Sequence, residues 1–250
     1  MPDSSRFLPV IPDPGRESGS ASGAAPIFER IAILGLGLMG GSIALAARKA
    51  WPAALVIGVD RHDVLEKAMV RHAVDVASSD PTIASAADLV VLAVPEADLT
   101  RVIAELPSWL PSEAVVTDVA STKRAVVEAA AALPPRLTFV GGCPLAGRPE
   151  SGFDHARADL FTGRPWILTP GPSGTEPAAQ ALEKVAAFVA GLGAVAVRAP
   201  SAGAHDELVD AMDRVIAQLE SLAPGLASAE TVEGLFAAAA ERHGQTGQGS

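Results

Sequence analysis

A glycine-rich segment followed by an acidic residue carries the clearest chemical signal in the sequence. Gly35, Gly37 and Gly40 follow an apolar run with the spacing G-x-G-x-x-G, and Leu38 and Met39 fill the intervening positions. The first glycine of such a segment permits a tight turn, the second lets the backbone approach a pyrophosphate, and the third allows close helix–strand packing. The amide groups and dipole of the helix that follows attract phosphate. The segment predicts a dinucleotide site, rather than a turn needed only for packing.

Asp60 strengthens this prediction and bears on which dinucleotide binds. It ends the next apolar run, where a carboxylate can accept hydrogen bonds from the hydroxyls of an adenosine ribose. A carboxylate would repel a 2′-phosphate, which favours NAD. Arg61 follows directly and would either pair with that phosphate, stack on adenine or lie in solvent. We therefore expect NAD, with NADP as the alternative.

Two further segments come at the ends of expected strands. Val94 and Pro95 close one strand, and Asp118 closes another, three residues before Ser121. Ligands in open α/β sheets bind beyond the carboxyl ends of the strands, so both segments should face the cofactor crevice. Ser121 can cap the next helix and also serve the site.

These residues need a framework, and the hydrophobic pattern supplies one. Short, nearly all-apolar runs alternate with amphipathic segments of helix length, which is typical of β-α units with a mostly parallel sheet covered on both faces. We expect a doubly wound, Rossmann-type α/β nucleotide-binding domain over residues 27–198. The expected strands lie at 30–35, 55–60, 88–94, 114–119, 138–142, 166–169 and 194–198, and the expected helices at 39–49, 63–71, 98–106, 123–133 and 176–192.

The flanking regions differ from this pattern. Residues 1–26 are rich in Pro, Ser and Gly and predict a disordered tail. Residues 199–243 predict a short C-terminal α-helical segment, with helices at 204–222 and 229–243, before a polar, flexible tail at 244–250. Leu208, Met212, Val215 and Leu219 recur at helical spacing, which fits packing on the sheet domain or a homodimer through these helices.

Composition excludes several function classes. Lys and Arg total 19 against 29 Asp and Glu, and no basic cluster stands out, so nucleic acid is not an expected partner. The uncharged stretch at 31–47 is shorter than the ~20 residues of a membrane span and carries four glycines. The single cysteine, Cys143, excludes an intrachain disulfide, and no metal-binding spacing is present. The start of the chain lacks the pattern of an export signal, so we expect a cytoplasmic protein.

The ordered motifs resemble one enzyme family. GLGLMGGSIALA, Asp60, LVVLAVP, TDVASTK, FVGGCPLAG, Ser151-Gly152, Leu160-Phe161, ILTP and His205-Asp206 follow the order found in prephenate/arogenate dehydrogenases. The resemblance implies an NAD(P)-dependent oxidoreductase that moves hydride from C4 of a cyclohexadienol with decarboxylation, on the route to tyrosine. It implies prephenate, arogenate or an analogue, such as an amino-substituted ring, as the small-molecule substrate. It also implies that Ser121 lies near the substrate hydroxyl and the nicotinamide.

The sequence departs from the family pattern where a catalytic histidine is expected. The family has a His-Pro pair, and this sequence has Cys143-Pro144. A thiol with a pKa near 8.5 is a poorer proton acceptor than imidazole, so Cys143 would serve only with a lowered pKa. His155 is a further catalytic candidate, and Glu150 stands one position after the family glutamate. The family's Ser-His-Leu-Pro-His signature is absent at 213–217, and its C-terminal helical domain usually exceeds the residues that follow Arg198.

Two other hypotheses remain open. The departures would also fit a nucleotide-binding regulatory or partner protein without catalysis. The GLGLMG opening is shared with β-hydroxyacid dehydrogenases, but residues 201–222 lack the lysine that those enzymes carry on the following helix.

Overall fold

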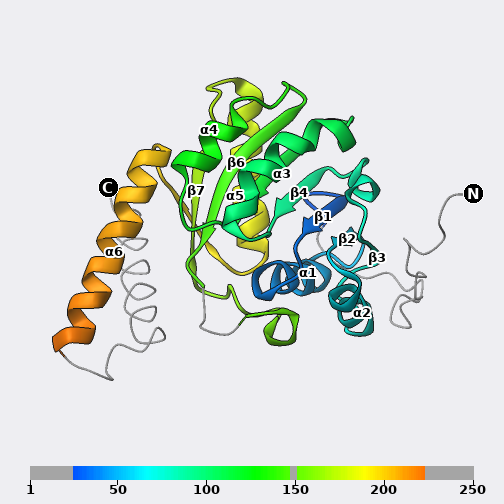
Figure 1. The fold of residues 1–250 in the computed structure, drawn as a ribbon, viewed down its shortest axis with the longest axis horizontal. Coiled ribbons are helices and arrows are strands. Elements are labelled where there is room, and N and C mark those ends of the chain that lie inside the picture. The colour runs from blue at the N-terminus through cyan, green and yellow to red at the C-terminus, as the bar shows by residue number, and fades with distance from the viewer. Residues whose placement is uncertain (1–24, 147–150, 223–250) are drawn as a thin grey trace, which may run out of the picture.

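An eight-stranded sheet forms the centre of the computed structural model, which describes residues 25–146 and 151–222 (Figure 1). Its order is β3-β2-β1-β4-β5-β6-β7-β8, and β1 to β6 pair in parallel. The strands are β1 (Arg30–Leu34), β2 (Leu55–Val59), β3 (Val76–Ser78), β4 (Leu89–Leu92), β5 (Ala114–Asp118), β6 (Leu137–Pro144), β7 (Pro165–Pro170) and β8 (Val195–Arg198). The strand order reverses direction between β1 and β4, so ligand is expected beyond their carboxyl ends.

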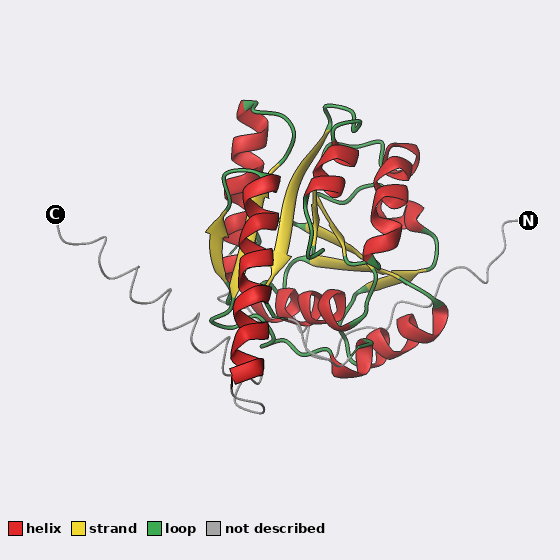
Figure 2. Cartoon of the chain, turned by 60° about the vertical axis from the view of Figure 1, so that its left-hand side comes forward, coloured by secondary structure: helices red, strands yellow, loops and turns green. Residues whose placement is uncertain are grey.

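Helices cover both faces of this sheet (Figure 2). One hydrophobic cluster joins the sheet to α1 (Leu38–Ala50), α2 (His62–Val70) and α5 (Glu176–Gly191). The other joins it to α3 (Glu96–Trp109), α4 (Arg124–Ala130) and the short η2 (Pro81–Ala84). The apolar strand runs are explained by this double coverage, because both faces of each central strand are buried. The predicted doubly wound Rossmann-type fold is confirmed.

The long helix α6 (Ala202–Leu222) lies beside the β7 end of the sheet and packs against α4 and β7. Side chains from β6, β7 and α6 meet in a small cluster that includes Cys143, Ile167 and Val209. The predicted helix at 229–243 and both predicted tails fall wholly or largely outside the described residues.

Three details differ from the sequence-based expectation. The strand β3 was not predicted, because Val76–Ser78 is too short to produce a recognisable apolar run. Helix α3 begins at Glu96 and continues through Pro107, so it is longer than expected at both ends. The strand β7 is antiparallel to β6. The described part of the segment between them contains only the short helix η3 (Phe153–His155), and no crossover helix there returns the chain to the amino end of β6.

Candidate functional site

The turn after β1 is shaped by its three glycines. Gly35 has a φ of 90°, and a Cβ there would lie 2.5 Å from the carbonyl oxygen of Ala93. A Cβ on Gly40 would lie 1.8 Å from the carbonyl oxygen of Gly35, so this glycine lets α1 approach the turn. A Cβ on Gly37 would meet no atom within 4 Å in the part of the chain that the structure describes, apart from its chain neighbours. The turn thus leaves open backbone at Gly37, at the N-terminus of α1.

Asp60 braces the same turn from the end of β2. Its carboxylate accepts hydrogen bonds from the amides of Leu36, at 2.6 Å, and Arg61, at 2.7 Å. A carboxylate has about four acceptor sites, so Asp60 retains capacity for ribose hydroxyls. Arg61 is exposed, and its guanidinium lies 3.5 Å from the carboxylate of Asp63. The structure brings Asp60 to the glycine turn and leaves Arg61 in solvent.

Other predicted cofactor residues lie around this edge in different environments. Leu38 is buried and Met39 is half-buried against the core, so mainly their backbones are available to a ligand. Val94 is half-buried, and the exposed Pro95 precedes the first turn of α3. Both follow β4, the strand beside β1 at the reversal of strand order.

Asp118 forms a fully buried ion pair with Lys123. Their side chains have no exposed surface, and Lys123 Nζ donates to the Asp118 carboxylate at 2.7 Å. Asp118 also accepts from the amides of Ala120 and Gly142, while Lys123 also donates to the carbonyls of Ala120 and Thr122. Burial raises the pKa of Asp118 above its ordinary value, although the Lys123 charge and the amides oppose this effect. Asp118 therefore holds the loop after β5, and its carboxylate is not accessible from the crevice.

Ser121 stands on that loop and is exposed, as is Thr122. The Ser121 hydroxyl donates to a carboxylate oxygen of Glu96 at 2.9 Å, and the Thr122 hydroxyl donates to the other. Partial burial opposes ionisation of Glu96, but the hydrogen bonds from Thr122 and Ser121 outweigh it and lower its pKa. Glu96 was not among the predicted site residues. Its position directly after Val94-Pro95 is the signal that would have found it.

A second carboxylate ties this loop to α6. Asp206 accepts from the amides of Lys123, at 2.7 Å, and Arg124, at 3.1 Å, at the start of α4. Its other neighbour is the fully buried His205, whose Nδ1 lies 2.9 Å from the same carboxylate. Partial burial works against ionisation of Asp206, but the hydrogen bonds from His205 and these amides lower its pKa. Asp206 thus caps α4 from a helix distant in the sequence.

Cys143 lies on β6 and is almost wholly buried, in the cluster with Ile167 and Ala199. Burial raises the pKa of its thiol to about 11, against the opposing charge of Lys123. The lowered pKa that catalysis by Cys143 would require is not present. The physical reason is the apolar packing of β6 against β7 and α6.

His155 lies on the short helix η3, a different element from the loop that carries Ser121. It is exposed on η3, which packs on α1 and α2. Arg71 on the segment after α2 donates to the carbonyls of Phe153 and Ala156 and fixes η3 there. Glu150 lies outside the described residues.

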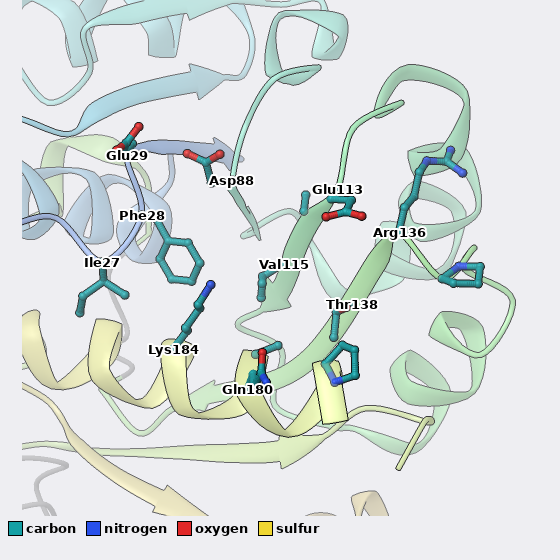
Figure 3. Close-up of a pocket in the computed structure, with 14 residues that line it drawn as sticks. Ile27, Phe28, Glu29, Asp88, Glu113, Val115, Arg136, Thr138, Gln180 and Lys184 are labelled. Carbon is teal, nitrogen blue, oxygen red and sulfur yellow. The ribbon is translucent and has the colours of Figure 1, made fainter. Parts of the chain in front are cut away.

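A cavity of about 500 Å³ lies at the opposite edge of the sheet, near the amino ends of β1, β4, β5 and β6 (Figure 3). Phe28, Val115 and Lys184 project into it, with Glu113 and Arg136 at one side. None of the predicted cofactor or catalytic residues lines this cavity.

Among the described residues, no group of three or more His, Cys, Asp or Glu side chains is arranged to hold a metal ion. No described helix combines the length and apolar character needed to cross a bilayer.

Comparison with known proteins places this geometry in a family. Residues 43–198 match the family model for the prephenate dehydrogenase nucleotide-binding domain. A prephenate dehydrogenase of Bacillus subtilis is 38% identical over 161 residues, covering 63% of this chain and 43% of the relative. The chain thus spans less than half the length of that relative.

Solved structures of arogenate and prephenate dehydrogenases are also similar to this chain. The arogenate dehydrogenase of Synechocystis superposes with a TM-score of 0.65 at 28% identity, over 82% of this chain and 79% of the other. The Aquifex aeolicus prephenate dehydrogenase in complex with hydroxyphenyl propionate and NAD+ gives a TM-score of 0.66 at 25% identity, over 79% and 71% of the two chains. With the family model covering more than half of its length, the chain belongs to the prephenate dehydrogenase family through its nucleotide-binding domain.

Proposed function

We propose that this protein is an NAD-dependent dehydrogenase that oxidises a cyclohexadienol of the prephenate or arogenate type. The observation that carries the proposal is the pairing of an open glycine turn after β1 with an exposed serine hydroxyl after β5, at the same edge of one sheet. The family match and the NAD+ complex of the Aquifex relative support the choice of chemistry.

The residues of the β1 turn fit a dinucleotide. Open backbone at Gly37 and the N-terminal amides of α1 would hold the pyrophosphate, and Asp60 would accept from the adenosine ribose. When bound, the nicotinamide would accept a hydride from the substrate. Asp60 would repel a 2′-phosphate, and Arg61 is already close to Asp63, which supports NAD over NADP.

Ser121 is the residue proposed to contact the ring hydroxyl of the substrate. Its loop is fixed on both sides, by the Asp118–Lys123 pair beneath it and by Glu96 beside it. A serine held in this way can donate or accept a hydrogen bond without first losing much freedom of motion. Cys143 is proposed to stand at the position of the family histidine as a packed, neutral thiol, without a catalytic role.

A non-catalytic nucleotide-binding module is the second candidate. The buried, protonated Cys143 is the observation that favours it, because the family's imidazole base is then replaced by a group that cannot accept a proton at neutral pH. Turnover that depends on Ser121 would exclude this candidate.

The apolar face of α6 also bears on assembly. Leu208 and Val215 are 43% and 46% exposed, and Met212 between them is half-buried. Three apolar side chains at helical spacing fit a helix of a second copy, so we propose a homodimer through α6.

Cofactor binding is tested by Gly37→Ala. Gly37 has a φ of −69°, which any residue adopts, so the free energy of unfolding should change by less than ~0.5 kcal/mol. The added Cβ should block the pyrophosphate and raise the Kd for NAD, measured by calorimetry, at least ~tenfold. Gly174→Ala, where a Cβ also meets nothing, is the matched control and should bind NAD normally. Unchanged affinity in Gly37→Ala would contradict this cofactor placement.

Turnover is tested by following reduced nicotinamide absorbance after adding prephenate or arogenate to protein and NAD. Ser121→Ala should lower kcat ~10²- to 10⁴-fold, because the variant loses the hydroxyl that contacts the reacting ring hydroxyl. Ser112→Ala, an exposed serine in the turn before β5, should behave as wild type. A wild type that binds NAD and turns over none of these substrates would refute the dehydrogenase proposal.

The neutral thiol is tested by Cys143→Ala. With a pKa of about 11, the thiol is ionised in only roughly one molecule in ten thousand at pH 7. The variant should keep kcat within ~threefold of wild type and lose ~1 kcal/mol of stability from reduced packing. A kcat lowered ~100-fold or more in steady-state assays would instead assign Cys143 a catalytic role.

Assembly is tested by sedimentation of Val215→Glu. A charge on the proposed contact face should shift a wild-type dimer to a monomer at micromolar concentration, because the carboxylate would be buried without a partner. Val70→Glu on α2, where the valine is 73% exposed, should remain dimeric. A monomeric wild type would contradict the proposed interface.

A further inference from the structure

Glu96 is the acidic residue in direct contact with the proposed substrate-binding serine. It is the first residue of α3, directly after β4, while Ser121 follows the neighbouring strand β5. The carboxyl ends of parallel neighbours meet at one edge, which brings Glu96 and Ser121 together although 25 residues separate them. Glu96 is therefore part of the edge at which the glycine turn lies.

The geometry gives Ser121 a defined hydrogen-bond direction. Its hydroxyl donates to Glu96 Oε2, with 2.9 Å between the two oxygens, and this leaves the lone pairs of Ser121 Oγ free to accept a hydrogen bond. The second oxygen of Glu96 is occupied by the Thr122 hydroxyl, which fixes the carboxylate plane. A hydroxyl group that donates to Ser121 Oγ would therefore be linked to the Glu96 carboxylate by two consecutive hydrogen bonds.

The groups around Glu96 favour its ionised form, and the other candidate proton acceptors among the described residues are placed less favourably. Lys123, on the same loop, favours the carboxylate form, and hydrogen bonds from Thr122 and Ser121 lower the Glu96 pKa against the cost of partial burial. Cys143 on β6 faces the same region as a neutral thiol. His155 is exposed on η3, and the His205 ring is fully buried beside Asp206.

We propose that Glu96 is the proton acceptor of this site and works through Ser121 in place of an imidazole. The inference rests on the proposed dehydrogenase function. As the hydride and its electron pair leave C4 of the ring for the nicotinamide, the proton of the ring hydroxyl moves to Ser121 Oγ, and the Ser121 proton moves to Glu96. The bond from the ring to its carboxylate then breaks, carbon dioxide leaves, and the electron pair makes the ring aromatic. Both protons move back and restore the phenol hydroxyl, so no net proton is released.

A carboxylate of low basicity is sufficient for this task. A hydroxyl whose carbon is losing hydride becomes strongly acidic, because it develops into a protonated carbonyl. The acceptor needs to be ionised and within hydrogen-bond reach in the transition state, and Glu96 meets both conditions through Ser121. Glu96 would be a positioning residue if it only oriented the serine, so the test must separate charge from position.

The test compares Glu96→Gln with the matched control Glu105→Gln, an exposed glutamate on the same helix that pairs with Arg101. Glutamine keeps the shape and can still accept from Ser121, but it cannot take a proton. We expect kcat for Glu96→Gln to fall ~10²- to 10⁴-fold, while calorimetry gives a Kd for NAD within ~threefold of wild type. Glu105→Gln should match wild type in both. Unchanged kcat, or a fall that parallels weaker NAD binding and a lower melting temperature, would overturn the inference.

A double variant provides an independent readout. Two residues that act as one relay are not additive, so Ser121→Ala with Glu96→Gln should be no more than ~twofold slower than the slower single variant. If the fold-losses in kcat of the two single variants multiplied in the double variant, the two residues would have separate roles and the relay would be overturned.

The pH profile of kcat gives a third readout. Protonated Glu96 cannot accept, so kcat should be flat near neutrality and fall as the pH drops through the Glu96 pKa, below the usual range of a glutamate. The Cys143 thiol, with a pKa of about 11, does not titrate in that range, whereas Asp206 does, so loss of the fall at low pH in Glu96→Gln assigns it to Glu96. A wild-type kcat that did not fall at low pH would overturn the relay.

A failure of the relay and a failure of the proposed dehydrogenase function would give different results. If wild type turns over its substrate and Glu96→Gln equals it, the relay alone fails. If wild type binds NAD and oxidises no cyclohexadienol, the proposed function fails and the relay falls with it.

Discussion

The buried ion pair between Asp118 and Lys123 is the interaction on which the site depends. Removing one partner of such a pair leaves an uncompensated charge in the interior, at a typical cost of ~3–5 kcal/mol. Here both charges also have hydrogen bonds to backbone groups, so the pair fixes the course of the loop between β5 and α4. The neighbouring strand is adapted to it: a Cβ on Gly141 would lie 2.9 Å from the Lys123 side chain, and one on Gly142 would lie 2.5 Å from the Asp118 carbonyl oxygen.

This constraint extends to α6. Asp206 accepts from the first amides of α4, so a carboxylate on one helix satisfies the free donors of another. The loop that carries Ser121 is consequently held from three sides, by the sheet below, by Glu96 on α3 and by Asp206 on α6. A helix at the edge of the domain thereby becomes part of the support of the candidate site.

Burial and hydrogen bonding together set the pKa values of Glu96 and Cys143 at this edge. Glu96 and Cys143 both lie near Lys123, yet the pKa of Glu96 is lowered and that of Cys143 is raised. The difference comes from access: Glu96 has two hydroxyl donors at the surface, whereas Cys143 is enclosed by the apolar side chains of β7 and α6. Their different surroundings therefore keep the Cys143 thiol neutral and the Glu96 carboxylate ionised, as the proposed relay requires.

The sequence alone determined the strand and helix alternation, the glycine turn and its acid, and the family, because these depend on local periodicity and short-range spacing. Lys123 stood in the TDVASTK segment, but no local pattern indicated that it would be buried against Asp118. Glu96 and Ser121 are 25 positions apart, and only the pairing of β4 with β5 makes them neighbours. The raised pKa of Cys143 likewise came from tertiary packing, since a thiol's ionisation depends on what encloses it and not on the residues beside it in the chain.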